Sequence, residues 1–361
     1  MIPLTLPAAA DADAAFVTRL RTDGCPGHPE DDSSLLAKSA GAAVFLGRFG
    51  LFEVTGVDAR DLHGDVVLVE PDRGRAHRLL RAGSGHNTLL VTERCDQLCI
   101  MCSQPPRKTH DDRFDHFERA CLLAEPDAVI GVSGGEPTLY KERLLTMIER
   151  VLARRPDLSF HVLTNGQHFE ADDVARLWDG PYDRVTWGIP LYAADAETHD
   201  KIVGKTGAFV RLEESLAHLM LAGAAVELRT VIIADNAAIL PSLARHVTAR
   251  LAFVASWSIM QLENAGFARA RWGRLRFAHK LDFAPVADAV DHAMLHGIDV
   301  QLFNFPRCTV PAAYRPLAPA SISDWKRRYA PACDGCSAKA DCTGFFEWHP
   351  EKEMVEMANP I

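Results

Sequence analysis

Three cysteines that lie close together carry the strongest chemical signal in the sequence. Cys95, Cys99 and Cys102 have the spacing Cys-x3-Cys-x2-Cys and follow the apolar segment 88–93. Iron–sulfur clusters are usually held by four cysteines, so a tight group of three predicts a cubane cluster with one iron open to another ligand. The alternative is a zinc site, which needs a fourth ligand such as His110 or His116.

A second group of cysteines lies near the C-terminal end of the sequence: Cys308, Cys333, Cys336 and Cys342. Four thiolates complete a tetrahedral site, which suits both zinc and an iron–sulfur cluster. The residues alone leave this choice open. Two cysteines stand alone and are expected to be small buried hydrophobic residues, Cys25 and Cys121.

Polar residues at the ends of apolar segments suggest further ligand contacts. Gly134, Gly135 and Glu136 form a turn in which two glycines let the backbone approach a ligand and a carboxylate can accept from an ammonium group; a simple turn is the alternative. Asn165 lies in a similar turn. Arg229 alternates with apolar residues and shares a sheet face with a glutamate two positions earlier. It can bind a carboxylate ligand or pair with that glutamate.

The elements that position these residues alternate between strands and helices. Six apolar segments read as strands, at residues 88–93, 127–135, 159–166, 183–192, 226–233 and 253–262, and each is followed by a helical pattern or a turn. This order predicts parallel β/α units. Six units are too few for a closed eightfold barrel, so we expect a partial (β/α)6 TIM-like barrel, with its chemistry at the C-terminal strand ends.

The expected domain boundaries follow from changes in composition. Residues 1–86 contain short β-type segments and are predicted to be a small β-rich module. Residues 87–300 are the partial barrel, and residues 301–361 are a C-terminal extension that carries the second cysteine group.

Composition excludes several classes of protein. The chain has 361 residues and a formal net charge of −9, so it lacks the basic surplus of a general nucleic-acid binder. No apolar run is long enough for a membrane helix, and the N-terminus has no basic region typical of a signal peptide. Nine cysteines in a chain of this length favour metal binding over disulfides, and we expect a cytoplasmic protein.

The three-cysteine spacing after a first strand resembles the radical S-adenosylmethionine (SAM) superfamily. This resemblance implies a [4Fe–4S] cluster whose open iron binds SAM, with Met101 near the adenine. It also assigns the Gly134–Glu136 turn to the SAM amino group, and makes Asn165 and Arg229 candidate cofactor contacts. The Cys-x2-Cys-x5-Cys pattern is similar to the twitch or SPASM extensions of peptide-modifying members, which favours an auxiliary [4Fe–4S] cluster over zinc.

Several runs are similar to one subfamily, the C-type radical SAM maturases of His-Xaa-Ser peptide systems. They are Cys102–Pro106, Asp195–Asp200 with Gly207–Phe209, Val226–Arg229 and Ser321–Lys326. The resemblance implies a ribosomally made precursor peptide or small protein as substrate, and a partner radical SAM maturase. The chemistry also requires a reductant such as flavodoxin or ferredoxin. The alternatives are a small-molecule or RNA substrate, or a non-catalytic iron–sulfur or zinc protein.

Some residues have two interpretations. His199 and Asp200 invite an acid–base role, but we expect them in a loop where Asp caps or turns the chain. Other histidines, such as His161 and His168, receive an ordinary surface or core interpretation. The basic run 326–328 is expected to be solvated or to contact an acidic leader peptide. The N-terminal module either adds a peptide strand at an open edge or caps the barrel.

Overall fold

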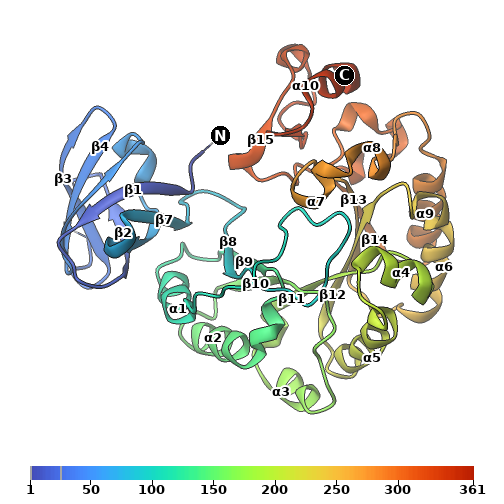
Figure 1. Cartoon of the computed structure of the whole chain (residues 1–361), viewed down its shortest axis with the longest axis horizontal. Coiled ribbons are helices and arrows are strands. Elements are labelled where there is room, and N and C mark those ends of the chain that lie inside the picture. Colours follow the sequence, from blue (N-terminus) through green and yellow to red (C-terminus); the bar gives the residue numbers. More distant parts are fainter. Residues whose placement is uncertain (1, 25–26) are drawn as a thin grey trace.

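The computed structural model describes residues 2–24 and 27–361, so Cys25 lies outside the described residues. A small β-barrel, a larger α/β unit and an irregular C-terminal segment follow one another along the chain (Figure 1). Among the described residues, no helix combines the length and the apolar character needed to cross a membrane.

The N-terminal part is a closed barrel of seven strands. They are β1 (Thr5–Ala10), β2 (Phe16–Arg21), β3 (Asp32–Ser39), β4 (Ala42–Gly47), β5 (Gly50–Thr55), β6 (Val66–Glu70) and β7 (Arg75–Leu80). Their order is β1-β5-β4-β3-β2-β6-β7, and β7 pairs back onto β1. Phe45, Phe52 and Val54 fill the interior. Closure removes the open edge that strand addition by a peptide would require, so that expectation is corrected for the described strands.

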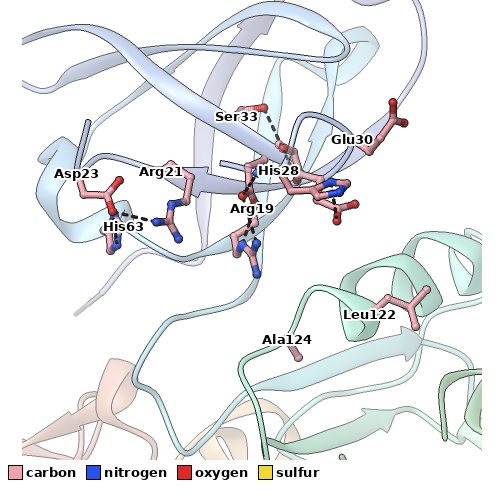
Figure 2. Close-up of polar contacts among 12 residues, drawn as sticks. Arg19, Arg21, Asp23, His28, Glu30, Ser33, His63, Leu122 and Ala124 are labelled. Atoms are coloured by element: carbon pink, nitrogen blue, oxygen red, sulfur yellow. Dashed lines mark hydrogen bonds and ion pairs between the residues drawn. The ribbon is translucent and has the colours of Figure 1, made fainter. Parts of the chain in front are cut away.

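The barrel packs against the α/β unit through apolar and charged contacts. Val17, Val66 and Leu68 belong to the same core cluster as the first helix of that unit. Around them, the Arg113 guanidinium donates to Glu70 at 2.8 Å. Polar contacts also order the barrel's own loops: the Arg21 guanidinium donates to Asp23 at 2.9 Å, and His63 lies on the other side of Asp23 at 3.9 Å (Figure 2). The barrel is therefore fixed to its neighbour.

The α/β unit is built on an open sheet of seven parallel strands, β8 (Thr88–Thr92), β9 (Val129–Gly134), β10 (Ser159–Leu163), β11 (Val185–Pro190), β12 (Ala225–Ile232), β13 (Ser256–Gln261) and β14 (Asp299–Phe303). The strands follow one another in chain order, so the sheet runs from β8 to β14 without a crossover. This arrangement is consistent with a partial TIM-like barrel. In Figure 1 the helices lie outside the curved sheet.

The helices of this unit are α1 (Phe114–Leu122), α2 (Lys141–Arg154), α3 (Asp173–Asp179), α4 (Ala196–Val203), α5 (Ala208–Leu221), α6 (Leu240–Arg250), α7 (Gly266–Ala270), α8 (Trp272–Leu275) and α9 (Ala284–Leu295). Alternate strand residues such as Phe160, Trp187 and Trp257 are fully buried between sheet and helices. The intervening residues face the hollow of the sheet, as the period of two requires.

The sheet has one strand more than the six expected. β14 pairs in parallel with β13, and Trp257 lies opposite Val300. Its sequence, Asp-Val-Gln-Leu-Phe, has only two fully apolar core positions, Val300 and Leu302. A five-residue edge strand of this kind gives too short an alternation to be recognised without its neighbour.

The C-terminal segment consists of short elements, β15 (Arg327–Arg328), β16 (Phe345–Phe346) and α10 (Glu351–Met357). It is attached to the α/β unit through α10, where Glu353 accepts from the Trp272 indole at 3.0 Å and pairs with Arg276 at 3.0 Å. On the other side of the segment, Asp324 pairs with Arg81, at the end of the N-terminal barrel, at 2.8 Å. The segment therefore joins both preceding parts.

Candidate functional site

The first cysteine group lies on one loop that leaves the C-terminal end of β8. We call residues 93–107 the cysteine loop. Cys95, Cys99 and Cys102 are all half-buried on it. The Gln97 amide donates to the Cys95 sulfur at 3.4 Å, and the Cys102 thiol donates to the Gln104 carbonyl at 3.0 Å. The loop thus places three sulfurs at the strand ends where β/α barrels hold their active sites.

Helix α4 supports one side of the cysteine loop. The amides of Leu98 and Ile100 donate to the carbonyls of Val203 and Ile202, at 3.0 and 2.9 Å. These carbonyls belong to the last turn of α4, where the helix itself leaves them without donors. Gly204 follows with a φ of +66°, and a side chain there would meet the Leu98 carbonyl at 2.6 Å. The helix end and the loop therefore complete each other's hydrogen bonding.

Helix α7 supports the opposite side. The Phe267 amide donates to the Cys102 carbonyl at 2.8 Å, and the Arg271 guanidinium donates to the Ile100 carbonyl at 2.8 Å. Gly266 allows this approach, because a Cβ there would lie 2.4 Å from the Cys102 carbonyl oxygen. The loop is held between two helices.

Asp96 anchors the loop between its first two cysteines. Its carboxylate accepts from the side-chain amide of Asn165 at 2.8 Å and from Lys205 at 2.5 Å, and His168 lies 3.3 Å away. Burial acts to raise the pKa of Asp96, but the hydrogen bonds and charges of His168 and Lys205 outweigh it and hold the pKa well below its usual range. In this arrangement Asn165 fixes the cysteine loop, and His168 belongs to the same network.

The Gly-Gly-Glu-Pro turn after β9 also contacts the cysteine loop. The Gly135 amide donates to the Thr92 carbonyl at 2.8 Å, and the Glu136 amide donates to the Arg94 carbonyl at 2.7 Å. A Cβ on Gly135 would lie 2.2 Å from the Arg94 carbonyl oxygen, and one on Gly134 would lie 2.6 Å from that of Thr92. The glycines thus allow the turn to approach the backbone that carries Cys95.

The Glu136 carboxylate is fully buried and bonded to the protein. One of its oxygens accepts from the Thr138 backbone amide at 2.8 Å and from the Thr164 hydroxyl at 2.6 Å. The other oxygen accepts from the Asn165 backbone amide at 2.5 Å. Burial raises the pKa of Glu136, against these hydrogen bonds. These contacts join the ends of β9 and β10, and the binding of the SAM ammonium by Glu136 stays a prediction.

Met101 and His199 are both buried. Met101 is 5% exposed and packs with Tyr192 and Leu262 in an apolar cluster, and its position near the adenine stays a prediction. His199 lies within α4, not in a loop, and burial lowers its pKa to about 4. Asp200 accepts from the Phe209 amide at 2.8 Å, which caps α5. Both residues have structural roles here.

The chemistry of the thiols is consistent with a metal cluster. Burial raises the pKa of Cys95 and Cys99 to about 12, and neighbouring thiols add to this effect. Burial also raises the pKa of Cys102. A bound cation must therefore displace the protons. Three cysteines on one loop match the donor set of an iron–sulfur cluster, which is held by cysteine thiolates.

A cavity of about 1100 Å³ lies beside this loop in the hollow of the sheet. Ser103 and Gln104, next to Cys102, form part of its wall. Other parts of the wall come from the N-terminal barrel at Leu4 and Arg78, and from the C-terminal segment. All three parts of the chain therefore enclose one space that opens near the cysteine loop.

The floor of the cavity contains a charged network. Glu227 accepts from Arg229 at 2.7 Å, from His161 at 2.5 Å and from the Ser258 hydroxyl. Burial raises the pKa of Glu227, but the hydrogen bond from His161 and the charge of Arg229 lower it to about 2. Arg229 also lies over the Phe303 ring. The expected ion pair is present, and Arg229 still lines the cavity.

His161 lines the cavity, although we expected it in an ordinary surface or core position. It lies on β10, where Phe160 and Val162 are buried against the helices and His161 points to the opposite face. The alternation that placed Arg229 on the inner face of β12 applies equally to β10. That signal was available in the sequence.

The rim of the cavity includes the segment Ser321–Lys326. Lys326 lies over the rings of Trp325 and Phe346 and is 3.7 Å from Glu263. Arg328, two residues later, pairs with Glu351 at 2.9 Å. The basic run is therefore half-buried, and its Lys326 and Arg328 are paired with carboxylates, which corrects the expectation of a solvated face.

The second cysteine group lies at a separate small pocket in the C-terminal segment. Four sulfur-bearing side chains line its wall, Cys308, Cys333, Cys336 and Cys342, and the volume is about 20 Å³. The amides of Arg307 and Gly344 each donate to the Cys342 sulfur at 3.4 Å. Amide donors directed at sulfur suit thiolates bound to metal. Cys121, in contrast, is fully buried in α1 among apolar residues, as expected.

Comparison with known proteins identifies the central part of the chain. Residues 89–236 match the model described as the Radical SAM superfamily. We call residues 89–236 the radical SAM domain, after the model that they match. They include the cysteine loop, the Gly-Gly-Glu-Pro turn and strands β9–β12. The comparison with curated protein sequences gives no match.

The chain is also similar to several solved structures. SuiB from Streptococcus suis, bound to S-adenosylmethionine, is 14% identical, with 60% of this chain and 49% of SuiB covered and a TM-score of 0.48. A radical SAM methyltransferase from Sphaerobacter thermophilus is 15% identical over 75% of each chain, with a TM-score of 0.46. Native anSMEcpe with bound AdoMet and the Cp18Cys peptide is 14% identical, covers 59% of this chain and 62% of that chain, and has a TM-score of 0.43. The chain spans about half the length of SuiB, and these values are too low to transfer a substrate.

Proposed function

We propose that the protein is a radical SAM enzyme that modifies a ribosomally made peptide or small protein. The observation that supports this most directly is the position of Cys95, Cys99 and Cys102. They share one braced loop in the radical SAM domain, beside a cavity of about 1100 Å³. When bound, a [4Fe–4S] cluster with SAM supplies one electron that cleaves a C–S bond and yields methionine and a 5′-deoxyadenosyl radical.

The chain's own residues hold and shield these groups. The three thiolates bind the cluster, and the contacts with α4, α7 and Asp96 fix the loop that carries them. Arg229 lies in the cavity floor, where one of its guanidinium nitrogens donates to Glu227, so its other donors can bind a ligand carboxylate. The surrounding walls exclude water from a reactive radical. Gly134 and Gly135 allow the turn after β9 to pack closely against the cysteine loop.

A peptide substrate is supported by the size and composition of the cavity. Small-molecule pockets usually have about 300–1000 Å³, and this cavity is larger and adjoins three parts of the chain. Its rim offers two tryptophans, Trp325 and Trp348, which suit contacts with side chains. We assign the substrate to the His-Xaa-Ser type on the five sequence runs described above, with a partner maturase and a flavodoxin or ferredoxin as reductant.

The four-cysteine site is proposed to hold an auxiliary [4Fe–4S] cluster, with zinc as the alternative. Its amide-to-sulfur contacts and its thiol-only donor set support this assignment. Metal analysis after anaerobic reconstitution distinguishes the two: about eight irons per chain indicate two cubanes, and about four irons with one zinc indicate the mixed case.

The enzymatic proposal is tested by incubating the reconstituted protein with SAM, a reductant and a His-Xaa-Ser precursor peptide. We expect 5′-deoxyadenosine and a mass change in the peptide. Cys336→Ala should still form 5′-deoxyadenosine but leave the peptide unmodified, if the second site serves the substrate. SAM cleavage that depends only on a small metabolite or an RNA would overturn the peptide assignment. No cleavage by a fully loaded protein would favour a non-catalytic iron–sulfur protein.

A further inference from the structure

A short segment after α10 passes over the four-cysteine pocket. We call residues 358–361 the tail. Pro360 and Ile361 line the same pocket as the four cysteines, although they lie far from Cys308 in the sequence. Gly344 and Phe345 complete the wall on another side. The tail is therefore part of the enclosure of this site.

The tail also directs two backbone amides at the cysteine sulfurs. The Asn359 amide donates to the Cys308 sulfur at 3.5 Å, and the Ile361 amide donates to the Cys336 sulfur at 3.4 Å. A neutral thiol is a weak acceptor, and an ionised acceptor makes a shorter and stronger bond. These hydrogen bonds are therefore strongest when the sulfurs are thiolates bound to metal.

Independent contacts hold the tail in this position. The Ser337 amide and hydroxyl both donate to the Ile361 carbonyl, at 3.0 and 2.8 Å. At the start of the segment, Lys280 donates to the Met357 carbonyl at 3.1 Å, which places a cation at the C-terminal end of α10. Met354 of α10 is buried against Ala330. The tail is thus anchored at both ends and spans the pocket between them.

We propose that the tail is a cover for the metal at the four-cysteine site, which retains the metal and, through the amides of Asn359 and Ile361, sets its reduction potential. The inference rests on the proposed metal-binding role of the four cysteines. Hydrogen bonds to sulfur and solvent exposure both control the potential of iron–sulfur clusters. Donors to sulfur stabilise the more reduced, more negative state, so their loss shifts the potential to more negative values.

The test uses the full chain with Cys95, Cys99 and Cys102 replaced by Ala, so that only the four-cysteine site is loaded. After anaerobic reconstitution, metal loss to an excess of chelator is followed by absorbance and metal content. Ile361→Pro and Asn359→Pro each remove one amide donor, and Ile361→Val and Asn359→Ala keep it as matched controls. We expect severalfold faster metal loss for the proline variants, and for iron–sulfur loading a more negative midpoint potential. The controls should behave like the parent.

Deletion of residues 359–361 removes both donors and the cover, and we expect the fastest metal loss from that variant. Circular dichroism and thermal melting check that α10 remains folded. Equal rates in the deletion, the proline variants and their controls would overturn the tail inference while leaving the metal site intact. Absence of any bound metal in the parent would instead overturn the metal site and the tail inference together.

Discussion

Gly135→Ala is expected to disable the first cysteine site although Gly135 is not a ligand. A methyl group at this position would lie 2.2 Å from the Arg94 carbonyl oxygen and 2.5 Å from its carbon. Contacts below 3.0 Å essentially never occur, so the backbone next to Cys95 must move by about 0.8 Å or more. Overpacking of this kind costs about 1–3 kcal/mol, and the strain falls on the loop that carries the thiols.

The consequence is measured as iron content and as the rate of 5′-deoxyadenosine formation. A misplacement of about 1 Å can reduce an enzymatic rate by roughly 100-fold, so we expect a loss of that order with reduced iron at the first site. Gly273→Ala is the matched control, because a Cβ at Gly273 has no atom within 4 Å. A Gly135→Ala protein with full iron content and an unchanged rate would refute the argument that this turn positions the loop.

Three further predictions follow from the site and its supports. Cys99→Ala should abolish 5′-deoxyadenosine formation while the four-cysteine site keeps its metal; retained cleavage would contradict the ligand assignment. Asp96→Asn weakens the contact with Lys205, so it should lower the free energy of unfolding by about 1–3 kcal/mol, and with it the melting temperature. The variant should also lose iron to a chelator faster, and an unchanged rate of iron loss would argue against this anchor. Burial lowers the pKa of His199 from 6.5 to about 4, so the unfolded chain takes up the proton first and stability falls as the pH drops from about 6.5 toward 4. In the parent protein this effect lowers the free energy of unfolding by about 2 kcal/mol at pH 5, and His199→Leu should remove it. The measurement is urea unfolding of both proteins at pH 7.5 and pH 5, and an equal pH dependence in the parent and the variant would contradict the prediction.

The sequence predicted the α/β order and the radical SAM resemblance because both depend on local patterns. The spacing of Cys95, Cys99 and Cys102 is visible in eight residues, and the strand that precedes them is a clear apolar run. β14 was not predicted because its five residues form too short an apolar pattern to be recognised as a strand without the neighbouring β13. Local sequence carries little information about such an edge strand.

The roles of several site residues depend on contacts that spacing does not reveal. Glu136 carries the carboxylate that an ammonium ligand needs, and in the fold this carboxylate accepts from Thr138, Thr164 and the Asn165 backbone amide. Asp96 lies between two cysteines, and only the tertiary structure shows that Lys205 reaches it. The type of a residue indicates what it can bind, but some of its partners come from distant parts of the chain: Thr164 lies 28 residues from Glu136, and Lys205 lies 109 residues from Asp96.

The bracing of the cysteine loop by α4, α7 and Asp96 has a thermodynamic consequence for assembly. Because these contacts involve protein atoms alone, folding has already removed most of the conformational freedom of residues 96–102 before iron arrives. Little entropy remains to be lost when a preformed cluster is transferred to the thiols. Stripping the iron should therefore leave an ordered receptor that can be refilled repeatedly, whereas a zinc finger unfolds when its ion is removed.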